Sequence, residues 1–440
     1  MPSDELARDT IAAVATPSGR GGIGIVRISG PAVPRIAHEI LRGLPPARRA
    51  TLARFRDAGG AAIDEGLALY FAAPESYTGE DVLELHGHGG PVVMQMLLAA
   101  CLDAGARLAE PGEFTRRAFL EGRLDLAQAE AVADLIDAAS EQAARSALRS
   151  LSGEFSAAIE ALRSALVELR ALTEAQLDFP EEELDELHRE DAAQRLTKVR
   201  GALEQVLAKS RQGSLLRSGV HAVLVGAPNV GKSSLLNRLA GQERAIVTAI
   251  PGTTRDALRE PILIDGLAVV LVDTAGLRTS GDELERLGMA RTRHELERAD
   301  LVLAVHDASD PDALDSLGSS RVPRIDVYNK VDLKPGFQPP PGALAVSAKT
   351  AEGLSDLRQA IVRTAGWSAT GESLFLARER HLRALAGAAA HLARAAADQE
   401  RWELFAEELR LAHEQLAAIT GAFGADDLLA EIFGRFCIGK

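Results

Sequence analysis

One glycine-rich stretch, residues 226–233, constrains the fold of this chain more than any other feature. It reads Gly-Ala-Pro-Asn-Val-Gly-Lys-Ser and fits the pattern G-x-x-x-x-G-K-[ST]. The apolar run before it predicts a strand, and the apolar spacing of residues 234–239 predicts a helix. In that context, backbone N–H groups and the helix N-terminus form a cradle for phosphate. We therefore predict a P-loop in which Lys232 reaches the β- and γ-phosphates and Ser233 holds Mg²⁺.

Three further motifs follow in the order typical of GTPases. An apolar strand leads to Asp-Thr-Ala-Gly at 273–276, which can hold Mg²⁺ through water and offer the Gly276 N–H to a γ-phosphate. Later strands lead to Asn-Lys-Val-Asp at 329–332 and to Ser-Ala-Lys at 347–349. The N-K-x-D stretch resembles the guanine-specificity motif, whose Asp carboxylate pairs with the N1–H and the exocyclic amine of guanine. Adenine cannot offer both groups, so the motifs predict a GTPase.

The predicted nucleotide site is drawn from these motifs and from the loop that ends at Thr254. We predict Ser233 and Thr254 as the Mg²⁺ ligands. The predicted GTP-binding residues are Asn229, Val230, Gly231, Lys232, Ser233, Ser234, Thr248, Ala249, Ile250, Pro251, Gly252, Thr253, Thr254, Asp273, Thr274, Ala275, Gly276, Asn329, Lys330, Asp332, Ser347, Ala348 and Lys349.

Composition limits the cellular setting and the partners. A length of 440 residues predicts two or three domains, and 46% hydrophobic residues can fill a sizeable core. Two cysteines, Cys101 and Cys437, are too few for a disulfide framework and favour the reducing cytoplasm. No apolar run approaches the ~18 residues that a membrane span needs. The formal charge of −14 disfavours a simple phosphate-coating protein, so a nucleic-acid partner must meet a local basic patch or bind through another protein.

The pattern of apolar and polar residues along the chain predicts a multidomain protein that combines α/β and all-α parts. Residues 1–118 show short apolar strands and one helix, which predicts an α/β domain. Amphipathic helical patterns fill residues 119–215 and return at 374–440, on both sides of the motif-bearing segment. We predict one helical domain interrupted by an inserted Ras-like P-loop G domain at 216–373.

Three other patterns suggest chemistry that their context does not favour. Residues 19–24 fit G-x-G-x-x-G but lead into a strand, which is the wrong context for a Rossmann site. His86 and His88 could form a metal pair, but a glycine turn with incidental histidines fits better, because no ligand partner stands at clear spacing. Residues 437–440 superficially fit a prenylation box, but their Gly and final Lys do not belong in one.

The chain resembles the MnmE (TrmE) family of tRNA modification GTPases from end to end. The likeness includes the block at 15–30, Tyr-Thr-Gly-Glu-Asp with its Gly-His-Gly-Gly sequel, and Pro-Gly-Glu-Phe-Thr at 111–115. It continues through Leu-Asp-Leu-Ala-Gln-Ala-Glu-Ala at 124–131, Asp-Phe-Pro-Glu-Glu-Glu at 178–183 and Gly-Thr-Thr-Arg-Asp at 252–256. The tail Phe-Cys-Ile-Gly-Lys and the N-terminal block are its most specific parts.

The resemblance implies an N-terminal domain that forms a homodimer and binds a one-carbon tetrahydrofolate, as the 5-formyl or methylene derivative. With the flavoprotein MnmG, in a heterotetramer, the family modifies C5 of the tRNA wobble uridine to an aminomethyl or carboxymethylaminomethyl group. Motif positions assign folate contacts to Arg27, Glu84, Arg123 and Lys440. Arg123 stands where the family often shows Lys. The positive charge is kept, but a planar guanidinium with several donors replaces a compact ammonium group. For Cys437 two alternatives remain open. It is a buried, inert thiol, or it is a catalytic residue, as the resemblance implies.

The resemblance also implies how GTP is cleaved. Leu277 follows the D-x-x-G motif and cannot orient water as a Ras-like Gln does. The family instead places K⁺ where an arginine finger would act, and Glu285 orients the attacking water. The implied K⁺ ligands are Asn229, Thr248, Ile250 and Thr253, whose oxygens suit a hard cation.

Two other functions remain open from the sequence. A ribosome-assembly GTPase of the Era or Der type shares this G domain, but would add a KH-like module or a second P-loop. A nucleotide-switched interaction protein would bind GTP without fast turnover.

Overall fold

The computed structural model describes residues 9–178, 186–241, 261–273, 294–310, 322–368, 374–398, 401–421, 429, 432–434 and 436–439. The chain forms two compact units: the first joins Met1–Ala133 to Ala417–Lys440, and the second is Asp134–Leu416. The domain limits at residues 118, 215 and 373 stay a prediction. Among the described residues, no helix combines the length and the hydropathy that a membrane crossing requires.

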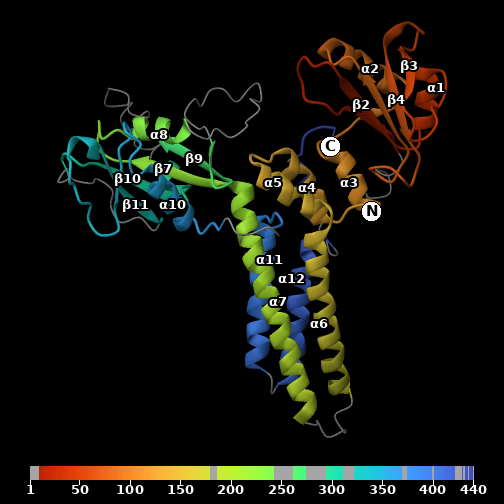
Figure 1. Cartoon of the computed structure of the whole chain (residues 1–440). Coiled ribbons are helices and arrows are strands. Elements are labelled where there is room, and N and C mark those ends of the chain that lie inside the picture. Colours follow the sequence, from red (N-terminus) through yellow and green to blue (C-terminus); the bar gives the residue numbers. More distant parts are fainter. Residues whose placement is uncertain are drawn as a thin grey trace. The chain divides into compact units, whose positions relative to one another are not determined.

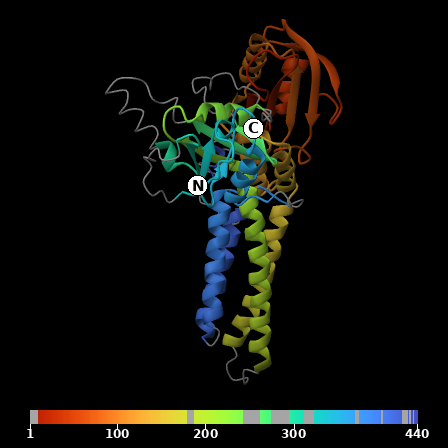
Figure 2. The ribbon, with the colours of Figure 1, turned by 60° about the vertical axis from the view of Figure 1, so that its left-hand side comes forward.

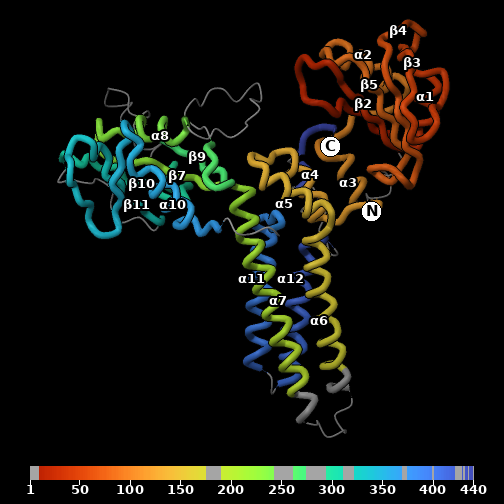
Figure 3. Tube along the Cα trace, in the orientation of Figure 1, coloured from red at the N-terminus to blue at the C-terminus, as the bar shows by residue number. Residues whose placement is uncertain are grey.

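A six-stranded sheet, ordered β3-β4-β5-β2-β1-β6, forms the centre of the first unit (Figures 1 and 3). Neighbouring strands are antiparallel, except for the parallel pair β1 and β6. The strands are β1 (Ile11–Val14), β2 (Gly24–Ser29), β3 (Thr51–Arg56), β4 (Ala62–Phe71), β5 (Val82–Gly87) and β6 (Arg107–Leu108). The strands that the apolar pattern predicts at residues 10–15, 24–28, 67–71 and 82–86 are confirmed, whereas the two edge strands, β3 and β6, are not predicted.

The two faces of this sheet have different neighbours. Helices α1 (Val33–Leu41) and α2 (Pro91–Asp103) bury one face, where Val26 and Ile28 of β2 are fully covered. Because side chains alternate along a strand, Arg27 points to the opposite face. There Ile11 and Ala13 pack against Phe114 of α3 (Glu113–Leu120). Cys101 of α2 is fully buried, and burial raises the pKa of its thiol to about 12.

The C-terminal residues return to this first unit. Phe433 and Phe436 pack against Leu126 and Ala129 of α4 (Leu126–Ile136) in one apolar cluster. Ile438 forms an isolated β-bridge with Pro111, just before α3. The last described residues therefore belong to the same compact unit as the N-terminal sheet.

Long helices make up one part of the second unit, and a second sheet makes up the other. The helices run side by side in the views of Figures 1 and 2, and α7 packs against both α6 and α11. The long helices are α6 (Glu154–Asp178), α7 (Glu186–Ser218), α11 (Glu379–Ala397) and α12 (Trp402–Thr420), and the shorter α5 (Glu141–Leu151) precedes α6. The predicted apolar stripe of α6 is confirmed, since Ile159, Leu162, Leu166 and Leu169 are all buried.

The second sheet, ordered β12-β11-β10-β7-β9-β8, carries the nucleotide motifs and is parallel except for β8. Its elements are β7 (Val220–Val225), α8 (Lys232–Ala240), β8 (Pro261–Ile264), β9 (Leu267–Asp273), β10 (Leu301–Asp307), β11 (Arg324–Asn329), the 3₁₀ turn η2 (Val331–Leu333), β12 (Leu344–Ala345) and α10 (Leu354–Thr364). The chain starts at the central strand β7 and next forms β8 and β9 on one side of it. It then crosses to the other side of β7, where β10, β11 and β12 follow. The P-loop follows β7 at this switch point, where open α/β sheets bind ligands.

Candidate functional site

The P-loop has the backbone geometry of a phosphate cradle. Helix α8 begins at Lys232, and Gly231 caps it with a left-handed φ of 93°. A Cβ at Gly231 would collide with the side-chain amide of Asn329. Glycine is therefore required here for both conformation and space, and the helix N-terminus stays open to an anion.

The predicted phosphate and Mg²⁺ residues lie together beside this loop. The Lys232 Nζ donates to the backbone carbonyls of Gly226 and Ala227, at 2.9 and 2.7 Å. The Ser233 hydroxyl donates to Oδ2 of Asp273 at 2.5 Å. Asp273 is only 3% exposed at the end of β9. A serine hydroxyl and an aspartate carboxylate in contact are the oxygen donors that Mg²⁺ prefers, so the residues fit that ion.

Asn329 joins two loops of the nucleotide site. Its Nδ2 donates to the Val230 carbonyl at 2.9 Å, and its Oδ1 accepts from the Ala348 N–H at 3.0 Å. The side chain is 2% exposed, so both of its polar atoms depend on these partners. The amide thus fixes the P-loop relative to the Ser-Ala-Lys loop.

The remaining N-K-x-D side chains are held by separate contacts. Oδ1 of Asp332 accepts from the Ser347 hydroxyl at 2.7 Å. Lys330 has a left-handed φ of 67°, and its Nζ donates to Asp307 at 2.7 Å. Burial alone would raise the pKa of Asp307, but the hydrogen bonds from Lys330 and Ser309 outweigh it and lower the pKa. The motif is therefore braced by β10 and by the loop after β12.

Several predicted site residues lie outside the described part of the chain. Asn229, Ser234 and Lys349 are described, and they belong to the P-loop, to α8 and to the Ser-Ala-Lys loop. The predicted residues that lie outside the described ones are Thr248, Ala249, Ile250, Pro251, Gly252, Thr253, Thr254, Thr274, Ala275, Gly276, Glu285 and Lys440.

A second polar cluster lies on the face of the N-terminal sheet that carries Arg27. Arg27 of β2 and Glu84 of β5 are register partners, and the Arg27 Nε donates to Glu84 Oε1 at 2.9 Å. The second carboxylate oxygen lies 3.1 Å from Nε2 of His86. The Arg27 guanidinium lies over the rings of Tyr77 and Phe114, at 5.6 and 5.7 Å from their centroids. Two of the predicted folate residues are thus brought together between aromatic walls.

The C-terminal tail reaches the same cluster. The Gly439 carbonyl accepts from Nη1 of Arg27 at 3.4 Å. Cys437 accepts a backbone hydrogen bond from Gly112 at 3.5 Å, and its side chain is exposed. The alternative of a buried thiol is therefore wrong. Arg123 is exposed, and among the described residues its side chain forms no hydrogen bond or ion pair with Arg27 or Glu84, so the structure does not bring it into this cluster.

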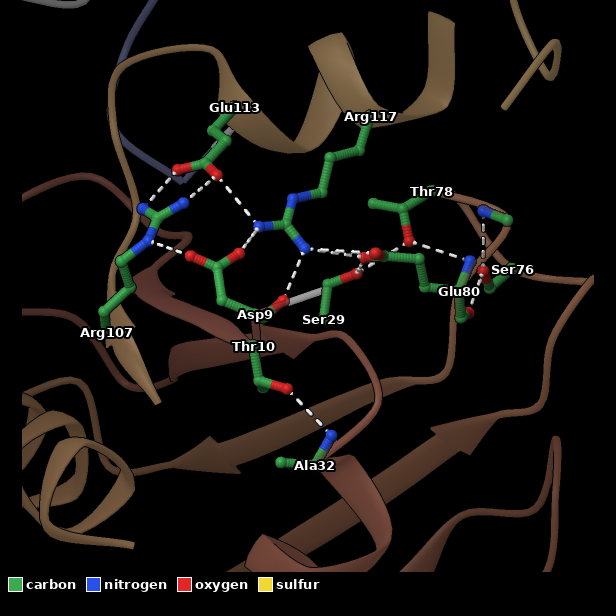
Figure 4. Close-up of polar contacts among 11 residues, drawn as sticks. Asp9, Thr10, Ser29, Ala32, Ser76, Thr78, Glu80, Arg107, Glu113 and Arg117 are labelled. Atoms are coloured by element: carbon green, nitrogen blue, oxygen red, sulfur yellow. Dashed lines mark hydrogen bonds and ion pairs between the residues drawn. The ribbon is translucent and has the colours of Figure 1, made fainter. Parts of the chain in front are cut away.

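An ion-pair network centred on the buried side chains of Arg117 and Glu113 lies in the same unit (Figure 4). Arg117 binds Asp9, Glu80 and Glu113, and Glu113 also binds Arg107. Burial alone would raise the pKa of Glu113, but hydrogen bonds from Arg107, Glu110 and Arg117 lower it. Glu80 belongs to the segment that carries Tyr77, whereas Glu113 and Arg117 belong to the helix that carries Phe114. The network therefore ties the two aromatic walls together.

The sequence analysis misses part of this second cluster. Tyr77 and Phe114 stand in family motifs, but nothing in their spacing shows that they flank Arg27. The glycine turn predicted at His86 is wrong, because His86 and Gly87 belong to β5. His86 and His88 contact different carboxylates, those of Glu84 and Asp64. The alternation of β5 could have placed His86 on the same face as Glu84.

The P-loop, the serine–aspartate pair and the N-K-x-D motif on a parallel sheet define a GTP-binding G domain of the P-loop class. Two family models cover most of the chain: "GTP-binding protein TrmE N-terminus" matches residues 10–123, and "MnmE helical domain" matches residues 126–437. A tRNA modification GTPase MnmE from Azoarcus sp. is 59% identical, covering 98% of both chains. The same-named protein of Thiobacillus denitrificans is 57% identical, again with 98% of each chain covered. The chain belongs to the MnmE family of tRNA modification GTPases.

Two solved structures of GTP-binding proteins are also similar to part of the chain. The G domain of the T. maritima FeoB iron transporter is 25% identical and covers 33% of this chain and 98% of that one, with a TM-score of 0.24. Aquifex aeolicus Era is 24% identical to this chain. The match covers 39% of this chain and 66% of Era, with a TM-score of 0.25. The family assignment therefore rests on the sequence relatives.

Proposed function

We propose that this chain is a K⁺-dependent GTPase that works with the flavoprotein MnmG, in the cytoplasm, to modify C5 of the wobble uridine in certain tRNAs. The product is an aminomethyl- or carboxymethylaminomethyluridine whose added carbon comes from a tetrahydrofolate one-carbon unit. One observation carries the proposal: a relative named as a tRNA modification GTPase is 59% identical over 98% of both chains. Matches to the TrmE N-terminus and the MnmE helical domain favour this function over ribosome assembly of the Era or Der type.

The G domain would supply nucleotide binding and turnover. Lys232 and Ser233 would hold the phosphates and Mg²⁺, with Asp273 as the neighbouring carboxylate. Asp332, whose Oδ1 accepts from the Ser347 hydroxyl, would select guanine through its carboxylate. Asn229 would give one oxygen to a K⁺ ion that stabilises the developing charge on the phosphate. Thr248, Ile250, Thr253, Thr254 and Glu285, which lie outside the described residues, would complete the Mg²⁺ and K⁺ shells and orient the water.

The first unit would hold the folate. Arg27 and Glu84 offer a cation and a carboxylate side by side, and a pterin ring carries both acceptor and donor groups on one edge. Tyr77 and Phe114 are aromatic groups near that pair. Arg123, Cys437 and Lys440 keep the roles that the family resemblance implies. Homodimerisation and a heterotetramer with MnmG would bring this cluster to the tRNA.

The proposal is tested in a strain whose own copy of the gene is deleted. Nucleoside mass spectrometry of its tRNA should show loss of the modified wobble uridine, which the wild-type chain restores. A Lys232→Ala chain should fail to restore it, while an Asn237→Ala chain, altered at an exposed site on the same helix, should succeed. Normal modified-uridine levels in the deletion strain would overturn the proposal.

A further inference from the structure

Positive charge is concentrated in one short segment of this acidic protein. The whole chain has a formal charge of −14, yet residues 35–56 contain six arginines and one glutamate. This segment runs from helix α1 to the edge strand β3, which pack against each other in the first unit. The nucleotide site and the Arg27 cluster include none of these arginines. The segment is therefore a charged surface without an assigned role.

A concavity of about 430 Å³ lies between the end of α1 and strand β3. Arg42, Arg54 and Arg56 are among the residues that line this hollow, and we call the hollow the arginine concavity. The loop after α1, with Pro45 and Pro46, forms its other wall. A surface hollow lined by three arginines is suited to an anionic ligand.

Two of these guanidinium groups converge on one turn. Nη1 of Arg56 donates to the Gly60 carbonyl at 3.0 Å. Nη2 of Arg42 lies 3.1 Å from the point that a Cβ on Gly60 would occupy. The carboxylate of this turn, Asp57, is directed to the Ala61 N–H at 2.8 Å. Among the described residues, neither Arg42 nor Arg56 forms an ion pair with a carboxylate.

The third arginine of the concavity is held only weakly. Arg54 pairs with Glu65 at 3.0 Å, but the two side chains are 57% and 52% exposed. Exposed pairs of this kind contribute little, on the order of 0–1 kcal/mol. Arg54 can therefore exchange Glu65 for a phosphate without a large cost. Arg54 then adds its charge to those of Arg42 and Arg56, which form no ion pair among the described residues.

We propose that the arginine concavity binds the phosphate backbone of tRNA, an assignment that rests on the proposed function. Guanidinium groups bind phosphate oxygens in a forked, bidentate geometry. Aromatic side chains make up only 4% of the chain, and none of them lines the concavity, so the surface recognises phosphates and not stacked bases. This surface would be the local basic patch that a directly bound nucleic acid needs on a chain with a net charge of −14.

Leu52 indicates the competing occupant. It lines the same concavity and is 70% exposed, so a second protein surface could also cover this edge. The charge of the three arginines favours RNA, because a second copy of this chain would bring the same cations to the contact. The experiment separates the two occupants by measuring oligomeric state together with RNA affinity.

The test compares the full-length chain with an Arg42→Gln, Arg54→Gln, Arg56→Gln triple variant. Binding of a fluorescent tRNA transcript is followed by anisotropy over a series of salt concentrations. We expect affinity near 0.1 M salt to fall at least about tenfold and the salt slope to shrink by roughly 2–3, since each lost phosphate contact removes about one. The control variant, Arg145→Gln, Arg383→Gln, Arg401→Gln, removes three exposed arginines of the second unit and should bind like wild type.

Several results would overturn the inference. They are unchanged tRNA affinity and salt slope in the triple variant, an equal loss in the control variant, or no measurable tRNA binding by the wild-type chain. A change of oligomeric state that parallels the lost affinity, seen by light scattering, would assign the concavity to a protein interface instead. GTP turnover is measured on the same preparations. A wild-type chain without turnover would count against the proposed function, whereas the arginine variant should keep it.

Discussion

The Ser233 hydroxyl donates to the Asp273 carboxylate across 2.5 Å, although 40 positions separate the two residues. The sheet explains the contact: β7 and β9 are parallel neighbours, with Leu224 opposite Asp273. The P-loop leaves the end of β7 and turns back, so that the first turn of α8 places Ser233 over the end of β9. Two motifs far apart in the sequence thus form one candidate Mg²⁺ site.

Replacing Ser233 by Ala should weaken nucleotide binding only when Mg²⁺ is present. The change removes one oxygen donor and leaves the backbone cradle of the P-loop in place. We expect GTP affinity in Mg²⁺ to fall by at least about tenfold, a loss of ~1.4 kcal/mol, while GDP affinity in EDTA stays close to wild type. Titration of a fluorescent nucleotide under both conditions measures this. Equal losses with and without Mg²⁺ would remove Ser233 from the metal site.

Replacing Asn329 by Ala should affect both nucleotide binding and the stability of the G domain. The change leaves the Val230 carbonyl and the Ala348 N–H without their partner. A buried polar group without a partner costs about 1–3 kcal/mol, so thermal unfolding of the domain should start at a lower temperature. Guanine nucleotide affinity should fall strongly because the P-loop and the Ser-Ala-Lys loop lose their common brace. Asn237→Ala is the matched control, and wild-type affinity in Asn329→Ala would contradict the bracing role.

The position of the P-loop could be predicted from the sequence, and the cluster around Arg27 could not. A P-loop carries its geometry in contiguous residues, so Gly231, Lys232 and Ser233 could be placed without a structure. The contact between Asn329 and Val230 needs the order of the strands, which single motifs do not contain. Strand β3 was missed because its exposed alternate positions carry Leu52 and Arg54, which blurs the apolar alternation of a strand.

The cluster around Arg27 shows the limit most clearly. Arg27 and Glu84 are register partners of two antiparallel strands, and register depends on tertiary pairing. Tyr77 and Phe114 reach the cluster from two segments joined by the buried network of Arg117. Neither spacing nor periodicity connects such segments. Only the end-to-end family resemblance predicted the pair, and it could not indicate the aromatic groups beside it.

Replacing Glu113 by Gln should destabilise the first unit and change its response to acid. Glu113 is 3% exposed and binds both Arg107 and Arg117. Its pKa in the folded state is lowered, so its ionised form contributes stability above the ordinary value of 4.5. That contribution is lost as pH falls through the lowered pKa. We expect the free energy of unfolding of the variant to be about 3–5 kcal/mol lower at neutral pH, because one partner of a buried ion pair is removed.

The acid limb of the unfolding curve provides the check on Glu113. Wild-type stability, followed by denaturant titration between neutral pH and about pH 3, should fall more steeply below 4.5 than that of Glu113→Gln. Glu141→Gln changes an exposed carboxylate in an i,i+4 pair and should leave the curve nearly unchanged. Parallel acid limbs for wild type and Glu113→Gln would show that Glu113 does not control this pH dependence.

The K⁺ mechanism can be tested at Asn229 without straining the backbone. Asn229 has a left-handed φ of 63°, which Gly adopts freely and Ala does not. Asn229→Gly therefore removes the side-chain oxygen while preserving the loop. Wild-type GTP hydrolysis should be faster in K⁺ than in Na⁺ at equal ionic strength, because the smaller Na⁺ fills the oxygen cage poorly. The variant should lose most of this difference. Equal wild-type rates in the two salts would rule out the mechanism.

Replacing Gly439 by Ala should separate tRNA modification from GTP turnover. Gly439 has a left-handed φ of 98°, and an added Cβ would lie 2.5 Å from the Val14 carbonyl oxygen. The substitution should therefore push the tail away from β1 and break the contact of the Gly439 carbonyl with Arg27. Modified wobble uridine should fall toward the level of a strain whose chain lacks residues 437–440, while GTP turnover stays near wild type. Gly434→Ala is the control, since Gly434 is an exposed glycine near the same end of the chain. Full modification by Gly439→Ala, measured by nucleoside mass spectrometry, would show that the position of the tail beside Arg27 does not matter for the reaction.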